Sequence, residues 1–315
     1  MQITRVIPKP FILSEGAEFA SNLVRELTGE KNKAKYLGGG SFGRAFRVQT
    51  SDGDFVVKIM LASGMAEKET HDLKLLGSRC PIRFPEVLYT SFADGNSGFD
   101  AYVMDTIPGK NALSSIPLFL ASKSKRLAFA DEVTEALHEI HKFTNPKFGD
   151  TLNPHSDTWT EYYHPFAEAV LQHAEEAEKR RELRGEIVCT LRRAMDKFDF
   201  IFSEPVTEAS LIHGDLNVAN IMVEGKKITG FIDPLNSMFA DREYDLFQFD
   251  NLTGKRFSLC SRYVEKYSSS EKFAFKKAFY ALYNEVYCFI RSGALIPLIM
   301  NPLVENMLAL LNKTE

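Results

Sequence analysis

The sequence predicts an α+β fold of two lobes, a small N-terminal lobe built on a β-sheet with helices and a larger, mainly helical C-terminal lobe. Two observations support this prediction. Before Pro108, short stretches of alternating apolar residues are separated by turn-forming pairs such as Asp52-Gly53. After Pro108, apolar residues recur at helical spacing over most of the chain. The change in pattern places the lobe boundary between residues 106 and 107, which gives lobes of 1–106 and 107–315.

The small lobe begins with a predicted helix over residues 14–27, because Ser14 is a good N-cap and Leu23 and Leu27 follow at helical spacing. A hairpin, a second helix and two further strands are predicted next, over residues 44–60, 66–76, 86–92 and 99–106.

Composition narrows the class of protein. The hydrophobic fraction of 44% and the 25 Phe and 11 Tyr are enough for a sizeable core, which argues against disorder. A net charge of −4 gives no general attraction to nucleic acid or to an anionic membrane. The four cysteines are dispersed and lack metal-ligand spacing, and no secretion signal is visible. We therefore expect a cytoplasmic protein, as a monomer or homodimer, with no nucleic-acid or membrane partner.

The strongest chemical signal is a set of three residues, each next to an apolar strand. Asp215 and Asn220 lie five positions apart in one loop, and Asp233 ends the strand that follows an intervening hairpin. An aspartate can orient and deprotonate an attacking hydroxyl. An asparagine and a second aspartate supply the hard oxygen ligands that Mg²⁺ prefers beside phosphates. Each residue alone could be an ordinary turn or cap residue, but the three together favour phosphoryl transfer. His213 is expected to hold the loop in place.

The small lobe contains independent support for a nucleotide site. A glycine-rich turn between two predicted strands would let backbone N–H groups approach phosphates, and it consists of Gly38, Gly39, Gly40, Ser41, Phe42 and Gly43. Alone, this turn is weak evidence and could be a plain hairpin. Lys58 lies within an apolar strand, where a lysine needs partners. Phosphate oxygens and a helix carboxylate are the expected partners, with Glu69 as first choice and Glu67 as second. Adenine is expected at the backbone of Met104, Asp105 and Ile107.

These motifs resemble those of the aminoglycoside phosphotransferase and fructosamine kinase superfamily, which has a protein-kinase-like fold. The resemblance extends over residues 36–252, and its most specific parts are His213-Gly214-Asp215 and Ile232-Asp233-Pro234. It implies an ATP- and Mg²⁺-dependent kinase of a small-molecule hydroxyl, most simply on an amino-sugar or ketosamine. It also implies that Asp245 supports the catalytic loop.

Two alternatives remain open. A protein kinase is disfavoured because the segment between Asp233 and Asp245 is too short for a long activation loop and contains no A-P-E sequence. A nucleotide-binding pseudokinase or regulatory module is disfavoured because all four of the expected groups are present, namely Lys58, Asp215, Asn220 and Asp233.

The acceptor site is expected at Trp159, Tyr163 and Glu285, with Tyr162 completing the aromatic group. Aromatic faces suit sugar C–H surfaces or cations, and a carboxylate could pair with an amine. The simpler interpretation makes Trp159 a core residue and Glu285 a surface residue.

Overall fold

The computed structural model describes residues 3, 5, 10–93, 99–251 and 253–314. Its contacts divide the chain into two compact units. The sheet unit contains the described residues from 10 to Phe119 together with Ala219–Pro234. The helical unit contains Leu120–Val218 and the chain from Leu235 onward. This division differs from the boundary expected at 106/107, because a later hairpin belongs to the first unit.

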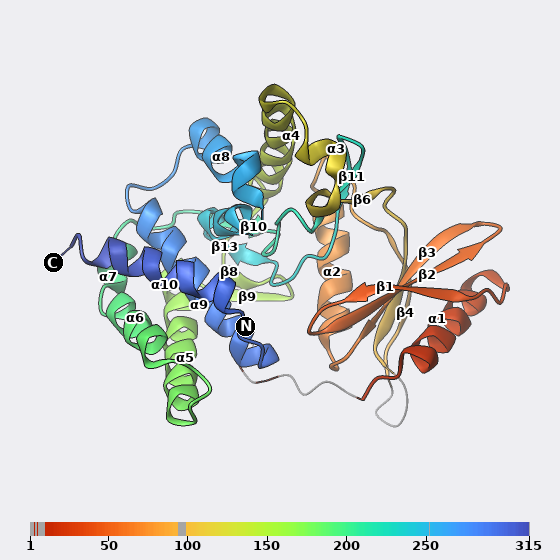
Figure 1. The fold of residues 1–315 in the computed structure, drawn as a ribbon, viewed down its shortest axis with the longest axis horizontal. Helices are drawn as coiled ribbons and strands as arrows, with labels where there is room; N and C mark the ends of the chain where they lie inside the picture. Colours follow the sequence, from red (N-terminus) through yellow and green to blue (C-terminus); the bar gives the residue numbers. More distant parts are fainter. Residues whose placement is uncertain (1–2, 4, 6–9, 94–98, 252, 315) are drawn as a thin grey trace. The chain divides into compact units, whose positions relative to one another are not determined.

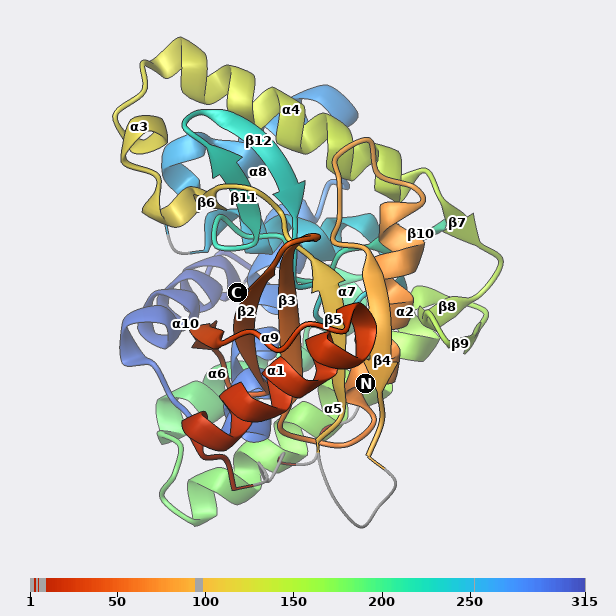
Figure 2. The ribbon, with the colours of Figure 1, turned by 90° about the vertical axis from the view of Figure 1, so that its right-hand side faces the viewer.

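The sheet unit is built on a five-stranded antiparallel sheet in the order β1-β2-β3-β5-β4. Its elements are α1 (Leu13–Thr28), β1 (Ala34–Gly39), β2 (Gly43–Thr50), β3 (Gly53–Met60), α2 (Met65–Gly77), β4 (Val87–Ser91) and β5 (Ala101–Asp105). Helix α1 crosses one face of this sheet (Figure 2). The predicted hairpin is confirmed, with Thr50 paired to Gly53 across a two-residue turn.

The core of this unit lies between α1 and the sheet. Ala20, Leu23 and Val24 of α1 pack in one buried cluster with apolar side chains of three strands, which are Phe46, Val48, Val57, Ile59, Ala101 and Val103. The strand residues alternate with more exposed ones, as expected for a sheet that buries one face more deeply. Burial of this face fixes the register of β3, and with it the position of Lys58.

A three-stranded sheet, β12-β11-β6, completes the sheet unit. It joins β6 (Lys110–Asn111) to the hairpin of β11 (Ile221–Glu224) and β12 (Lys227–Phe231). After β6 the chain forms two single turns, η1 (Ala112–Ser114) and α3 (Ile116–Phe119), before it enters the helical unit. Asn111 pairs with Met222, and this long-range pairing is why residues 219–234 belong to the first unit.

The helical unit combines helices with a five-stranded sheet in the order β7-β10-β13-β8-β9. Its helices are α4 (Lys123–His141), α5 (Trp159–Lys179), α6 (Gly185–Met195), α7 (Phe198–Ile201), η2 (Arg242–Asp250), η3 (Gly254–Phe257), α8 (Leu259–Tyr267), α9 (Phe273–Ser292) and α10 (Pro297–Leu311). Its strands are β7 (Thr144–Asn145), β8 (Phe148–Asp150), β9 (Asn153–Ser156), β10 (Ala209–Ile212) and β13 (Met238–Ala240).

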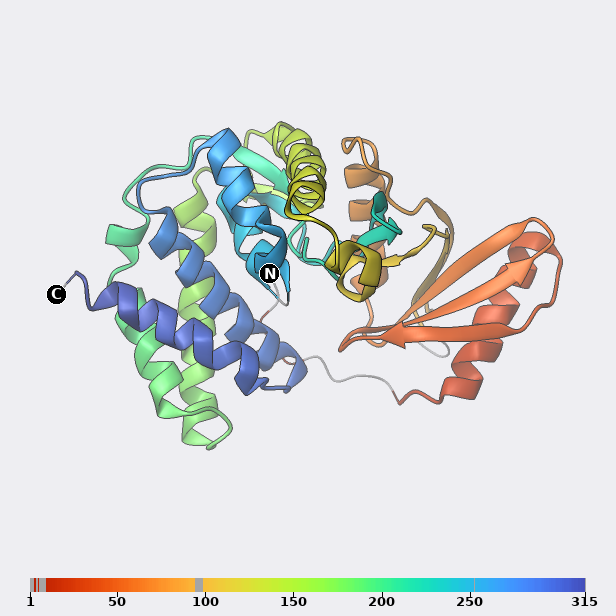
Figure 3. The same cartoon turned by 45° about the horizontal axis from the view of Figure 1, so that its top comes forward.

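Local sequence explains how the main helices of this unit begin and pack. Thr158 and Glu161 form a capping box that satisfies backbone N–H groups at the start of α5. Helices α5, α6, α9 and α10 lie against one another (Figures 1 and 3).

The α+β class predicted from the sequence is confirmed. Within the described part of the chain, no helix is long and apolar enough to cross a membrane.

Candidate active site

Lys58 of β3 lies between two carboxylates in the sheet unit. Its Nζ contacts Glu69 of α2 and lies 2.5 Å from Oδ1 of Asp233. Burial acts to lower the pKa of Lys58, but the carboxylates of Asp233 and Glu69 outweigh it and raise this pKa well above its usual range. Lys58 is therefore a fixed cation, and its helix partner is Glu69, the one that the sequence favoured over Glu67.

The glycine-rich turn lies beside this lysine. Gly38 and Gly39 end β1, Gly43 begins β2, and residues 40–42 form the turn between them. A Cβ at Gly43 would lie 3.1 Å from Cε of Lys58, so glycine here leaves room for the lysine stem. Arg44 holds the turn by donating hydrogen bonds to the carbonyls of Gly40 and Gly43, at 2.5 and 2.8 Å. The turn keeps the backbone N–H groups of this segment close to a positive charge.

Asn220 and Asp233 lie together at the open end of the β11–β12 hairpin. Ile221 pairs with Phe231, and the N–H of Ile232 donates to the carbonyl of Asn220 at 3.0 Å. Asp233 follows directly, with a left-handed backbone (φ 58°) and a side chain that is 48% exposed. A non-glycine residue in this conformation is strained, and such strain is concentrated at functional positions. The pair offers an amide and a carboxylate, both oxygen donors that suit a hard cation.

The segment expected to meet adenine is the end of β5 and the residues after it. Met104 pairs with Val56 and Val87 in the sheet. The side chain of Asp105 contacts Arg83 and accepts the N–H of Glu86 at 2.8 Å, so this carboxylate is already engaged. Ile107 is buried against Gly230 of β12. Adenine recognition here would therefore depend on backbone groups and apolar contacts.

The loop that carries Asp215 is anchored inside the helical unit by Asp245 of η2. The N–H groups of His213 and Gly214 donate to its two carboxylate oxygens at 2.8 and 2.7 Å. Gly214 has a φ of +81°, and a Cβ there would lie 2.4 Å from the carbonyl oxygen of Leu235, so only glycine fits. Nε2 of His141 lies 3.1 Å from the same carboxylate. His213, His141 and Asp245 are all buried, so the backbone that leads into Asp215 is fixed.

Asp215 itself has close neighbours in the helical unit. Nδ2 of Asn217 donates to Oδ1 of Asp215 at 2.9 Å, which fixes the orientation of the carboxylate. Burial raises the pKa of the Cys288 thiol to about 12, and the nearby carboxylates of Glu285 and Asp215 add to this rise. Burial also raises the pKa of Glu285. The carboxylates of Glu285 and Asp215 therefore both lie close enough to Cys288 of α9 to raise the pKa of its thiol.

Two expected acceptor residues require correction. Trp159 and Tyr163 are 1% and 0% exposed, so neither can present a face to a substrate. Their rings stack with centroids 5.0 Å apart, and Nε1 of Trp159 donates to the hydroxyl of Tyr280 at 2.8 Å. These residues form the contact between α5 and α9 and belong to the core. Tyr162 remains partly exposed, and it interacts with Asp150 and Tyr287.

Several supporting residues were not identified from the sequence. Asn217 is near Asp215 in the chain, so its contact had a local signal in the spacing of two residues. His141 contacts Asp245 across 104 positions, and no local pattern indicates such a pairing. Tyr102 hydrogen-bonds to Glu69, and its place opposite Lys58 in the paired strand could have suggested it.

The fold, with a β-sheet N-terminal lobe and a helical C-terminal region, is found in a class of phosphotransferases. The chain belongs to the phosphotransferase enzyme family (APH), whose model matches residues 33–267. No curated protein sequence matches the chain.

Solved structures of the same fold include aminoglycoside phosphotransferases and a fructosamine kinase. A thermostable mutant of aminoglycoside phosphotransferase APH(4)-Ia in its apo form is 18% identical, with 93% of this chain and 99% of that chain covered and a TM-score of 0.67. A proposed fructosamine-3-kinase from Haemophilus somnus is also 18% identical, with 94% and 100% covered and a TM-score of 0.66. The GDP and kanamycin complex of APH(2")-IIia is 16% identical, with 89% and 92% covered and a TM-score of 0.61.

Proposed function

We propose that this phosphotransferase moves the γ-phosphoryl group of ATP to a hydroxyl of a small molecule, most simply an amino-sugar or ketosamine. The observation that carries the proposal is the partly buried Lys58 cation, which is held by Glu69 and Asp233 beside a glycine-rich turn. A cation fixed in this way is suited to the α- and β-phosphates of a nucleotide.

Within this proposal, each group has a chemical role. Asp215, oriented by Asn217, accepts the proton of the acceptor hydroxyl as the hydroxyl attacks the γ-phosphorus. Asn220 and Asp233 would hold the magnesium ion, which neutralises phosphate charge when bound. The described residues contain no cluster of three or more His, Cys, Asp or Glu side chains that could hold a metal ion.

The nature of the acceptor is supported by similarity and by charge. One solved structure of the same fold is a ternary complex of an APH(4)-Ia mutant with AMP-PNP and hygromycin B, at 17% identity. In this chain, Glu285 and Asp215 both lie near Cys288. Two carboxylates in one region favour an acceptor with an amine besides its hydroxyls. Glu285 remains our candidate for the amine contact, and Tyr162 takes the place of the buried Trp159 and Tyr163.

The test is an ADP-release screen with ketosamines, aminoglycosides, choline-like amines and neutral sugars as acceptors. The control is Asp215→Asn, which keeps the shape of the side chain. We expect turnover with at least one amine-bearing acceptor and a loss of roughly 10²–10⁴-fold in the variant, as for removal of a general base. Near-normal turnover in the variant would refute the role of Asp215. Nucleotide binding without turnover on any acceptor would favour a pseudokinase.

A further inference from the structure

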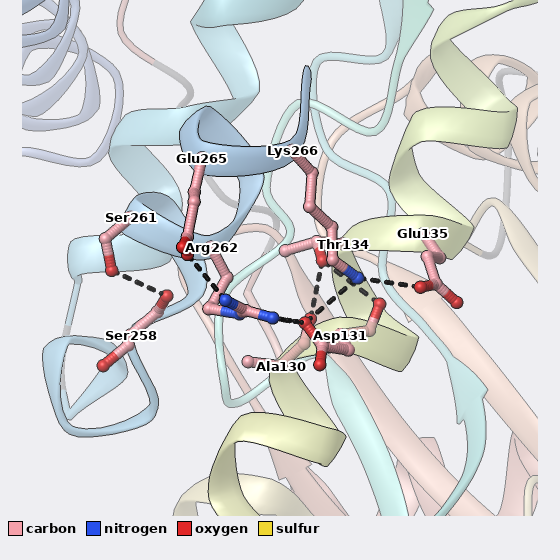
Figure 4. Close-up of polar contacts among 9 residues, drawn as sticks. All are labelled: Ala130, Asp131, Thr134, Glu135, Ser258, Ser261, Arg262, Glu265 and Lys266. Carbon is pink, nitrogen blue, oxygen red and sulfur yellow. Dashed lines mark hydrogen bonds and ion pairs between the residues drawn. The ribbon is translucent and has the colours of Figure 1, made fainter. Parts of the chain in front are cut away.

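Helix α8 is fastened to α4 by a network of ion pairs in the helical unit. Nη2 of Arg262 lies 2.7 Å from Asp131, and Nζ of Lys266 lies 3.0 Å from Asp131 and 2.8 Å from Glu135 (Figure 4). Each pair is partly exposed, so each one adds little stability alone. Together they fix how α8 lies along α4.

Beneath this network, α8 contributes one buried polar group to the inside of the unit. Tyr263 is 0% exposed, and its hydroxyl oxygen lies 2.6 Å from Nδ1 of His141. The other ring nitrogen of His141 is the one that contacts Asp245. Asp245 in turn accepts the N–H groups of His213 and Gly214. A continuous hydrogen-bonded chain therefore connects α8 to the loop of Asp215.

The chemistry of the neighbours sets the direction of each hydrogen in this chain. Asp245 accepts backbone N–H groups, so Nε2 of His141 must carry the hydrogen that lies between them. The guanidinium of Arg242 lies near the Tyr263 hydroxyl, and its Nη2 donates to the carbonyl of Tyr267 at 2.9 Å. With the hydrogen of His141 on Nε2, its Nδ1 is an acceptor, and the Tyr263 hydroxyl can direct its hydrogen to it. In this arrangement Tyr263, His141 and Asp245 each have a hydrogen-bond partner.

We propose that Tyr263 is a positioning residue for phosphotransfer, because it fixes the tautomer of His141 and thereby the loop of Asp215. The position of helix α8 on α4 determines whether Tyr263 reaches His141. The kinetic part of this inference rests on the proposed function. The structural part, the fixed tautomer and the anchored loop, does not.

The decisive variant is Tyr263→Phe, which removes one hydroxyl and keeps the packing of the ring. Without that donor, Nδ1 of His141 has no partner and the hydrogen on Nε2 is no longer specified. We expect kcat to fall roughly tenfold, the effect of one lost buried hydrogen bond, with the KM for ATP unchanged. We also expect faster hydrogen exchange at the amides of His213 and Gly214, and a changed ¹⁵N shift pattern for His141.

Tyr267→Phe is the matched control. It removes a hydroxyl from the next turn of the same helix and keeps the ring stacked on His138 with centroids 3.7 Å apart. Faster exchange at residues 213 and 214 in Tyr263→Phe alone would support the proposal, even if no acceptor gave turnover. Wild-type exchange and an unchanged His141 ¹⁵N pattern in Tyr263→Phe would overturn it. Equal loosening of the whole helical unit in both variants would also overturn it, since the effect would then be general destabilisation.

Discussion

Replacement of Lys58 by methionine separates the structural role of the lysine from its proposed role in catalysis. Lys58→Met removes the ammonium and keeps most of the apolar stem. Of its two partners, Asp233 is 48% exposed and can return to water, whereas the side chain of Glu69 is only 9% exposed. The variant therefore leaves the buried carboxyl of Glu69, whose pKa burial raises to about 7, without its cation. Breaking a buried pair in this way costs about 3–5 kcal/mol, so we expect a loss of that size in the free energy of unfolding.

The double variant Lys58→Met with Glu69→Gln is the matched control. Glutamine removes the charge and can still hydrogen-bond to Tyr102, so the free energy of unfolding should recover to within about 1 kcal/mol of wild type. Nucleotide turnover should stay lost in both variants, because the phosphates lack their cation. Urea unfolding followed by circular dichroism, together with ADP release, measures both effects. Equal instability of the single and double variants would refute the explanation by a buried charge.

Two further predictions concern the helical unit. Glu285→Gln should raise the KM for an amine-bearing acceptor and leave the KM for ATP unchanged; unchanged acceptor kinetics would remove Glu285 from the site. Burial lowers the pKa of His138 to about 4, and the nearby cations of Lys142 and Arg242 add to this effect. The folded pKa is thus below the unfolded value of about 6.5, so the stability from a neutral His138 is complete above pH 6.5 and is lost as pH falls toward 4. In His138→Phe the urea midpoint should fall less between pH 7 and 4 than in wild type, and parallel pH dependence in the two proteins would contradict this reasoning.

Local patterns were sufficient for the parts of the site whose residues lie close together in the chain. Lys58 was recognisable because a lysine in an apolar strand needs partners, and Glu69, the first choice among the carboxylates of the following helix, is one of them. The pair of Asn220 and Asp233 was recognisable because an antiparallel hairpin brings its two ends together.

Local patterns failed where the deciding contact was distant in the chain. An aromatic run such as Trp159 to Tyr163 does not indicate which residue faces the core, because that depends on α9, more than a hundred positions later. The structure assigns Trp159 and Tyr163 to the core and leaves only Tyr162 partly exposed. The lobe boundary was affected in the same way, because the pairing of β6 with β11 cannot be inferred from either strand alone.

The pairing of Asn111 with Met222 also has a consequence for how the protein is made. On the ribosome, the first strand of this pair emerges long before its partner. At roughly 5–20 residues per second, β11 is synthesised on the order of ten seconds after β6. During this interval the edge of β6 is unpaired, and an unpaired strand edge is a site for association with other chains. A fragment that ends near residue 119 would keep this edge permanently open, so we expect such a fragment to aggregate unless β11 and β12 are supplied.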